Sequence, residues 1–310
     1  MSDWPIPWAP VAGTRTGVFA WLESVLAEGT LGGLSRLPAG AQDALVGAMA
    51  RIARRVDARH SEAARRFIAQ ALPHLDEGER EALVLQSWRH FITTLLRNVA
   101  FDRKVPAATR LDHYVTDFSP AVQDIVDREA ACIAVTAHVG DYDAGAAFFP
   151  AAGFRRFYAV TRPPKNKPLS VSTQRLREGR GYRILHRRGA FGDIAKIVGA
   201  GGSVALLLDQ RPHGNALIAP FFGRMAPCER GAAVLLRRLR VPVIIGACYT
   251  TDVPYRYRMF FHTVLQPDDL KGASPEEIVT RVNAEMERLI LRHPEQYFWL
   301  HDRFRDAPAI

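Results

Sequence analysis

Residues 132–145, which read CIAVTAHVGDYDAG, combine a short apolar run, a histidine and the beginning of a helix. The apolar run ends at Ala137, directly before His138. Gly140 permits a sharp turn, and we expect a helix to begin near Asp141. This order is typical of a strand that passes through a tight turn into a helix. Ligands of α/β sheets bind at the carboxyl ends of strands, so the stretch also indicates where a site could lie.

The chain beyond this stretch repeats the same rhythm of short apolar strands and amphipathic helices. Helices are predicted in the segments between the strands and after the last of them. Alternation of this kind indicates an α/β fold with a mostly parallel central sheet flanked by helices. The predicted strands are 132–138, 156–162, 182–186, 203–210, 242–250 and 256–265.

The first hundred residues have a different pattern. Apolar residues recur three and four positions apart from Thr14 to about Phe101, which predicts helices throughout. No repeat or low-complexity linker separates this part from the rest. We therefore expect a single domain over residues 1–310, with a helical N-terminal part at 1–110 and an α/β catalytic core at 111–310.

Composition narrows the possible partners. The formal net charge is +9, which favours acidic partners such as nucleic acid, an anionic membrane, a phosphorylated substrate or an acidic carrier protein. The three cysteines, Cys132, Cys228 and Cys248, have no C-x-x-C spacing, which argues against disulfides and thiolate zinc sites and favours a reducing, cytoplasmic setting. The histidines lack metal-ligand spacing, so no bound metal is expected. No cofactor is expected either.

The N-terminus has features of a surface helix. It lacks the pattern of a secretory signal, and no run of about 18 uncharged apolar residues predicts a membrane-spanning helix. An apolar stripe at helical spacing admits two interpretations: a helix packed on its own domain, which is the commoner case, or a helix that rests on a bilayer. The stripe consists of Val18, Trp21, Leu22 and Val25, widened by Phe19 and Leu26.

The first candidate for chemistry is the pair His138 and Asp143, which has the spacing H-x4-D. We expect Asp143 to lie in the first turn of the following helix, where its carboxylate could hold one imidazole nitrogen. The other nitrogen would then act as a general base on a substrate hydroxyl. The alternative is that His138 caps the helix and Asp143 only favours its N-terminus. The motif is short and common, so by itself it does not decide between the catalytic and the capping interpretation.

Charged and amide side chains near the other strand ends are candidates for substrate binding. Arginine suits phosphate because its guanidinium can donate two parallel hydrogen bonds. A solvated basic surface is the alternative for such residues. A pair of phenylalanines beside one of the arginines could contact an acyl chain, although core packing is the commoner use. The candidates are Arg162, Asn166, Arg175, Arg177, Asp209, Gln210 and Arg224.

These segments, in this order, resemble the lipid A late acyltransferases, a family of lauroyl and myristoyl transferases. The C-terminal stretch 293–305, HPEQYFWLHDRFR, is similar to the closing signature of that family and is the most specific part of the match. The resemblance extends from about residue 14 to residue 306. H-x4-D alone would place the chain only in the wider glycerolipid acyltransferase superfamily.

The resemblance implies an O-acyltransferase that moves a fatty acyl chain from an acyl thioester to a hydroxyl of a lipid A precursor. His138 would be the general base, Asp143 would hold its tautomer, and Arg162 would lie near the reaction centre or a substrate phosphate. Asp209 matches an acidic position of the family and could fix an arginine. The implied partners are acyl carrier protein or acyl-CoA, a phosphorylated glycolipid and a membrane surface, with peripheral attachment at the cytoplasmic face of the bacterial inner membrane.

Some residues depart from the family pattern. Asp143 stands where the lipid A enzymes more often carry glutamate, and Asp141 stands where asparagine is usual. These changes leave other hypotheses open: an acyltransferase for a lysophospholipid or glycolipid, or a non-catalytic membrane-binding relative. Nucleic acid is not an expected partner, because the arginines accompany strand ends and apolar loops and no reading motif is present.

Overall fold

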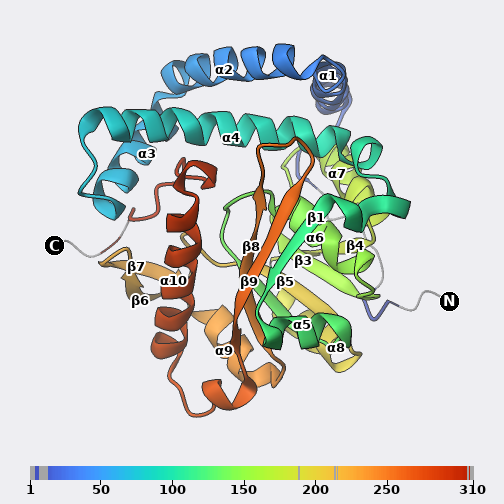
Figure 1. Cartoon of the computed structure of the whole chain (residues 1–310), viewed down its shortest axis with the longest axis vertical. Helices are drawn as coiled ribbons and strands as arrows, with labels where there is room; N and C mark the ends of the chain where they lie inside the picture. Colours follow the sequence, from blue (N-terminus) through green and yellow to red (C-terminus); the bar gives the residue numbers. More distant parts are fainter. Residues whose placement is uncertain are drawn as a thin grey trace.

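The computed structural model describes residues 4–6, 13–187, 189–212, 214, 216–305 and 307. Four helices form the N-terminal part and lie across one end of the molecule, with α4 in contact with α1, α2 and α3 (Figure 1). A capping box at Asp76 and Glu79 fixes the start of α4, since each side chain accepts a hydrogen bond from the other residue's backbone N–H. These helices are α1 (Val18–Leu34), α2 (Ala39–Val56), α3 (Ala58–Ala71) and α4 (Glu77–Lys104).

A seven-stranded sheet in the order β1-β9-β8-β2-β5-β3-β4 forms the centre of the molecule. The strands β8, β2, β5, β3 and β4 are parallel, whereas β9 pairs antiparallel with β8 and parallel with β1. The predicted α/β class and mostly parallel sheet are confirmed. The bounds are β1 (Tyr114–Phe118), β2 (Ile133–Thr136), β3 (Phe157–Thr161), β4 (Tyr182–His186), β5 (Ser203–Leu207), β8 (Val243–Thr250) and β9 (Tyr257–Leu265).

Helices cover both faces of the sheet, and each face has its own apolar core. The larger core joins the sheet to α8, α9, α10 and the N-terminal helices, and the smaller one joins it to α5 and α6. Because both faces are covered, the central strands are apolar along their whole length. The helices of this part are α5 (Pro120–Asp127), α6 (Tyr142–Ala151), α7 (Lys167–Gly179), α8 (Ala190–Gly199), α9 (Arg230–Leu239) and α10 (Pro275–Arg292), and short 3-10 helices are η1 (Ala107–His113), η2 (Pro267–Leu270) and η3 (Pro294–Gln296).

Three strands were not predicted from the sequence. The edge strand β1 was missed, and so was an antiparallel hairpin of β6 (Ala216–Phe221) and β7 (Arg224–Glu229). Pro220 and Pro227 lie inside these two strands. Proline cannot donate to a central ladder, but a two-stranded ribbon tolerates it.

The strand order has a direct consequence for the site. β2 and β5 are neighbours, and their parallel register pairs Thr136 with Leu207. Two residues beyond this pair, the chain reaches His138 on one side and Asp209 on the other. Parallel strands end at the same edge of a sheet, so this register brings the two side chains together although 71 positions separate them.

Candidate functional site

Four neighbouring parallel strands each end in a polar or charged residue at the same edge of the sheet. His138 follows β2, Asp209 follows β5, Arg162 follows β3 and Arg187 follows β4. The carboxyl edge of a parallel sheet is where ligands of α/β proteins bind. Sequence analysis had identified three of these residues but not Arg187, which the same strand-end rule could have found.

His138 is held by Asp209, not by Asp143. The His138 Nδ1 and Asp209 Oδ1 atoms are 2.7 Å apart, and Asp209 is only 1% exposed. Burial raises the pKa of the Asp209 carboxyl, but the contact with His138 outweighs it, and the net result is a lowered pKa. Asp209 is therefore a carboxylate at neutral pH. It accepts a hydrogen bond from the His138 Nδ1–H, which leaves the Nε2 atom as the basic nitrogen. The expectation that Asp209 fixes an arginine is thus corrected.

The backbone around His138 is fixed from three directions. Gly140 has φ +67° and a side chain there would collide with the Cys248 carbonyl oxygen, so only glycine fits this turn. The Gly140 N–H donates to the Gln296 carbonyl, and the Phe298 N–H donates to the carbonyl of His138. On the third side, the half-buried His90 ring makes a 2.9 Å hydrogen bond to the Gly140 carbonyl. These contacts rigidly position the imidazole at the end of β2.

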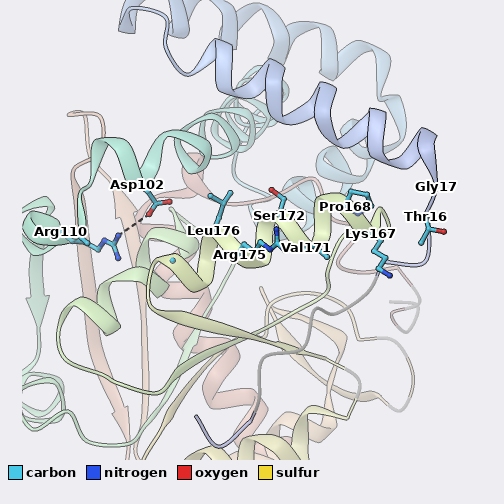
Figure 2. Close-up of a pocket in the computed structure, with 12 residues that line it drawn as sticks. Thr16, Gly17, Asp102, Arg110, Lys167, Pro168, Val171, Ser172, Arg175 and Leu176 are labelled. Carbon is cyan, nitrogen blue, oxygen red and sulfur yellow. Dashed lines mark hydrogen bonds and ion pairs between the residues drawn. The ribbon is translucent and has the colours of Figure 1, made fainter. Parts of the chain in front are cut away.

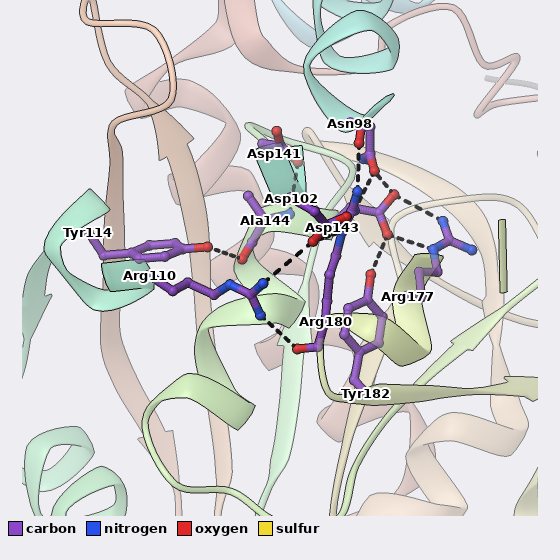
Figure 3. Close-up of polar contacts among 10 residues, drawn as sticks. All are labelled: Asn98, Asp102, Arg110, Tyr114, Asp141, Asp143, Ala144, Arg177, Arg180 and Tyr182. Atoms are coloured by element: carbon purple, nitrogen blue, oxygen red, sulfur yellow. Dashed lines mark hydrogen bonds and ion pairs between the residues drawn. The ribbon is translucent and has the colours of Figure 1, made fainter. Parts of the chain in front are cut away.

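Asp143 lies in the first turn of α6 as predicted, but its carboxylate is engaged elsewhere (Figure 3). Arg177 of α7 binds both oxygens, with Nε–Oδ1 2.8 Å and Nη2–Oδ2 3.0 Å. Tyr182 donates to Oδ1 and Asn98 of α4 donates to Oδ2. Burial raises the pKa of Asp143, but Arg177 and the other donors lower it to about 2. The predicted contact between His138 and Asp143 is therefore wrong, because these three donors occupy both carboxylate oxygens.

The polar contacts continue beyond Asp143 into a larger cluster, all of which Figure 3 displays. Arg180 pairs with Asp102 at 3.0 Å and donates to the side chain and backbone of Asn98. Arg110 donates to the carbonyl of Arg180. The cluster connects α4, η1, α6, α7 and β4, so it fixes the helices around the site. We name the residues Asn98, Asp102, Arg110, Asp143, Arg177, Arg180 and Tyr182 the clamp.

A second acid at the start of α6 differs from Asp143. Asp141 caps the helix by accepting a hydrogen bond from the Ala144 N–H, and it is 1% exposed. Among the described residues no cation forms an ion pair with it; burial raises its pKa to about 6, although Arg180 and Arg97 act in the opposite direction. The same turn of helix thus holds one carboxyl with a raised pKa and one with a lowered pKa.

A cavity of about 1310 Å³ opens beside His138. Its polar part contains His138, Gln210, Arg211 and His301 together with the strand-end arginines Arg162 and Arg187. Its apolar part lies between the sheet and α6, where Ala134, Ala205 and Ala159 align in register across β2, β5 and β3. Small side chains at these positions leave room above the strands, and the apolar part is further lined by Gly145, Phe149, Phe157 and Phe261.

The predicted substrate-binding residues divide into two groups. Arg162, Gln210 and Arg177 line the cavity, although Arg177 is committed to Asp143. Asn166 does not line it: its side chain caps α7 by accepting from the Leu169 N–H and donates to the Ala20 carbonyl, which ties α1 to α7. Arg224 is also elsewhere, with its guanidinium over the ring of Phe304. For Asn166 and Arg224 the structure therefore assigns packing roles in place of the expected substrate contact.

Arg175 projects into a separate surface groove of about 870 Å³ (Figure 2). The groove follows α7, with Lys167 and Thr16 towards one end and Asp102 and Arg110 towards the other. α7 lies between the groove and the cavity, since Ser172 and Leu176 contribute to the lining of both. The prediction that Arg175 faces the same ligand as His138 is not supported by this position.

The C-terminal signature forms the wall behind His138. Tyr297 pairs with Val139 in a β-bridge, and the Gln296 side chain hydrogen bonds both the N–H and the carbonyl of Thr250. The Trp299 backbone N–H donates a 3.1 Å hydrogen bond to Ser87 Oγ, and the buried Arg303 donates to the Pro227 carbonyl. The signature thus joins α4, β8 and the β6–β7 hairpin to the strand end that carries His138.

Helix α1 presents an unusual surface. Its buried residues are the small Ala20 and Ser24, whereas its large apolar residues face outward, led by Phe19 at 84% exposed. Among the described residues, no helix is long and apolar enough to cross a membrane. The other side of α1 contributes Ala27, Glu28 and Leu31 to the cavity. The exposed residues Val18, Phe19, Trp21, Leu22, Val25 and Leu26 are named the α1 patch.

In the part of the chain that the structure describes, no three His, Cys, Asp or Glu side chains form a cluster suited to a metal ion. The three cysteines are buried and are not paired with one another. The chemistry that follows from this geometry is that of a histidine base with a carboxylate partner.

Comparison with known proteins agrees with the geometry. The family model described as bacterial lipid A biosynthesis acyltransferase matches residues 18–306, which is nearly the whole chain. A search of curated proteins gave no match to this chain.

Proposed function

We propose how this chain, which belongs to the bacterial lipid A biosynthesis acyltransferase family, carries out acyl transfer to lipid A. His138 removes the proton from a hydroxyl of a lipid A precursor, and the oxygen attacks the carbonyl carbon of an acyl thioester. The observation that carries this proposal is the 2.7 Å hydrogen bond between His138 Nδ1 and Asp209 Oδ1 at the mouth of the cavity. It leaves the His138 Nε2 atom as an acceptor that can take a proton.

The steps balance without any other reactant. As the acceptor oxygen–carbon bond forms, the hydroxyl proton moves to His138 Nε2 and the carbonyl electron pair moves to oxygen. Asp209 stabilises the resulting imidazolium by its negative charge. The tetrahedral intermediate then expels the thiol sulfur, which takes the proton from His138, and the acyl ester is released. Asp209 and His138 thereby return to their starting states.

The two parts of the cavity suit the two ends of such substrates. Arg162 and Arg187 are at the polar end, where arginine can bind phosphate groups of a glycolipid through paired hydrogen bonds. The apolar part between α6 and the alanine row is proposed to hold the acyl chain that is transferred. Phenylalanines at its far end would limit the length of that chain, because a packed core resists overfilling.

The lipid acceptor requires contact with a bilayer, and the α1 patch is proposed to provide it. Six large apolar side chains on one helix would lose their contact with water in the membrane interface. Since α1 also lines the cavity, this docking would bring the cavity towards the lipid. We place the protein peripherally at the cytoplasmic face of the inner membrane, where acyl carrier protein is the proposed donor. Its acidic surface complements the +9 charge of the chain.

The test is transfer by the purified protein. Lauroyl or myristoyl carrier protein and, separately, the matching acyl-CoA would be incubated with a lipid A precursor, a lysophospholipid and a glycolipid, with products identified by mass spectrometry. We expect wild type to acylate the lipid A precursor and His138→Ala to be inactive while it remains folded. Acylation of only another lipid would reject the proposed acceptor. A deletion strain complemented fully by His138→Ala would reject catalysis altogether.

A further inference from the structure

His301 belongs to the C-terminal signature and lines the polar part of the cavity. Its Nε2 atom accepts a 3.0 Å hydrogen bond from the backbone N–H of Arg211. A nitrogen that accepts from an amide carries no proton, so in the neutral ring the proton must be on Nδ1. Over the residues that the structure describes, no group receives a hydrogen bond from this Nδ1–H.

The surroundings keep the His301 ring neutral. Burial lowers the pKa of His301, and although Asp209 raises it, the charges of Arg303, His138 and Arg211 lower it further, to about 4. These are the charged and titratable groups that face the ring. At neutral pH, His301 is therefore an uncharged hydrogen-bond donor with a defined tautomer.

Two short series of hydrogen bonds and chain neighbours connect His301 to His138. Arg211, which donates to His301, lies two residues after Asp209, which holds His138. The segment that carries His301 also runs beside the histidine base, since Phe298 N–H donates to the carbonyl of His138 at 3.0 Å. Both imidazoles therefore border the same end of the cavity, and neither hydrogen bonds the other.

We propose that His301 is a second catalytic residue, whose Nδ1–H donates a hydrogen bond to the thioester carbonyl oxygen as it becomes an oxyanion. This role rests on the proposed function. The donor does not transfer its proton: the acceptor hydroxyl proton goes to His138, and the oxyanion electron pair returns to re-form the carbonyl when the sulfur leaves.

A neutral donor suits this position for an electrostatic reason. When His138 becomes an imidazolium, a second positive charge beside it would raise the energy of the state that forms, whereas an N–H dipole would not. The Arg211 N–H is already bound to His301, so it is not available for the oxyanion. A fixed donor aimed at a developing negative charge is typically worth about 100- to 1000-fold in rate.

The experiment compares His301→Ala and His301→Gln with wild type and with His293→Ala as the matched control. His293 is in the same signature but pairs with Glu295 and contacts the ring of Tyr249, and it does not line the cavity. For His301→Ala we expect kcat to fall about 100- to 1000-fold, with KM changed less than about threefold. His301→Gln, which can both accept and donate, should recover at least tenfold, and His293→Ala should resemble wild type.

A purely structural role would give a different pattern. If His301 only held the 209–211 segment, its loss would disturb Asp209 and move the acidic limb of the pH–rate profile, which reports the base. We expect that limb to be unchanged in His301→Ala. Wild-type kcat in His301→Ala, a moved limb, or no recovery in His301→Gln would overturn the inference. Failure of the wild-type protein to transfer any acyl chain would instead overturn the proposed function and this role with it.

Discussion

Two buried carboxylates near the same strand end, Asp209 and Asp143, have different partners. Asp209 accepts a hydrogen bond from the His138 imidazole and has a further side-chain contact with Tyr297, and His138 lines the cavity. Asp143 receives hydrogen bonds from Arg177, Tyr182 and Asn98, which leaves none of its oxygens for the histidine. Both have lowered pKa values despite burial, one because of His138 and the other because of Arg177.

The contacts of the two carboxylates suit different roles. Those of Asp209 suit the orientation of a base, and those of Asp143 suit the stabilisation of the fold. A carboxylate that orients a base needs one directed contact and a partner that can gain and lose a proton. A carboxylate that joins α4, α6, α7 and β4 needs several permanent donors, and an arginine never releases its proton. The acid of H-x4-D serves the second purpose in this molecule, so its mutation should damage stability more than the chemical step. The predictions below test this separation.

Replacement of Asp209 should have the largest effect. In Asp209→Asn the side-chain amide can present N–H to the imidazole and favour the wrong tautomer, while its shape is kept. We expect kcat to fall roughly 10⁴-fold, as in other enzymes with a histidine–aspartate pair. Single-turnover transfer measures this loss, and a near-UV circular dichroism spectrum confirms that the protein is folded. A loss below about tenfold would mean that Asp209 does not orient the base.

Replacement of Asp143 should mainly reduce stability. Asp143→Asn removes the counter-charge of the buried Arg177, and breaking such a pair typically costs about 3–5 kcal/mol. We expect the free energy of unfolding in urea to fall by that amount, with kcat of the folded protein reduced less than tenfold at low temperature. The double variant Asp143→Leu with Arg177→Met is the control, since it removes both charges and should regain part of the stability. A 10⁴-fold loss of kcat with unchanged stability would restore Asp143 to the catalytic pair.

The sequence predicted which residues lie at the site better than it predicted which of them contact one another. The strand ends identified His138, Arg162 and Gln210, because an apolar run that stops at a polar residue marks a carboxyl edge. The pairing of His138 with Asp209 depends on the strand order β8-β2-β5-β3, which local patterns do not contain. The spacing of H-x4-D placed Asp143 in the correct helical turn, but Arg177 and Tyr182 come from elements that no local rule puts beside it.

The fold class, like the strand ends, could be predicted from local patterns. The elements that were missed are those whose local pattern does not reveal them. Apolar strands alternating with helices require a layered α/β architecture, so six of the seven sheet strands were found. The edge strand β1 escaped detection, as its burial is only partial, and prolines concealed the β6–β7 hairpin. Asn166 and Arg224 show that a polar residue near a strand end can equally be a cap or a packing partner.

Asp141 has a raised pKa and Asp143 a lowered one, so replacement of Asp141 should change stability in the opposite direction. Its pKa is about 6 in the folded protein against an ordinary value of 3.8, a difference of about 2 units or about 3 kcal/mol. A raised carboxyl pKa stabilises the fold below pH 4, and this stabilisation is lost as pH rises from about 4 to about 6. Asp141→Asn keeps the cap on the Ala144 N–H and also restores the residue that is usual in the family. It should be more stable than wild type at pH 7 by up to about 3 kcal/mol.

The measurement is the urea midpoint of both proteins from pH 4 to pH 7. Wild type should lose stability with rising pH relative to Asp141→Asn over this interval. The depressed pKa of Asp143, about 2, acts at lower pH: its contribution is present above about pH 4 and is lost as pH falls towards 2. Parallel pH profiles for wild type and Asp141→Asn between pH 4 and 7 would contradict the assignment of a raised pKa to Asp141.

Substitutions in the α1 patch, which contains neither carboxylate, should have the smallest effect on the isolated protein. Phe19→Ser with Leu26→Ser changes two exposed side chains, so stability and transfer to a short-chain soluble acceptor should stay within twofold of wild type. Binding to vesicles that contain anionic phospholipid should fall by at least about 100-fold, because each of the two lost apolar side chains removes about 1.5–3 kcal/mol of burial in the bilayer. Co-sedimentation measures this, with Val253→Ser as the control: Val253 is an exposed apolar residue outside α1. Equal binding of the double variant and wild type would show that another surface meets the membrane. A loss of transfer to vesicle-bound acceptor, with transfer to the soluble acceptor retained, would show that α1 brings the cavity to its lipid.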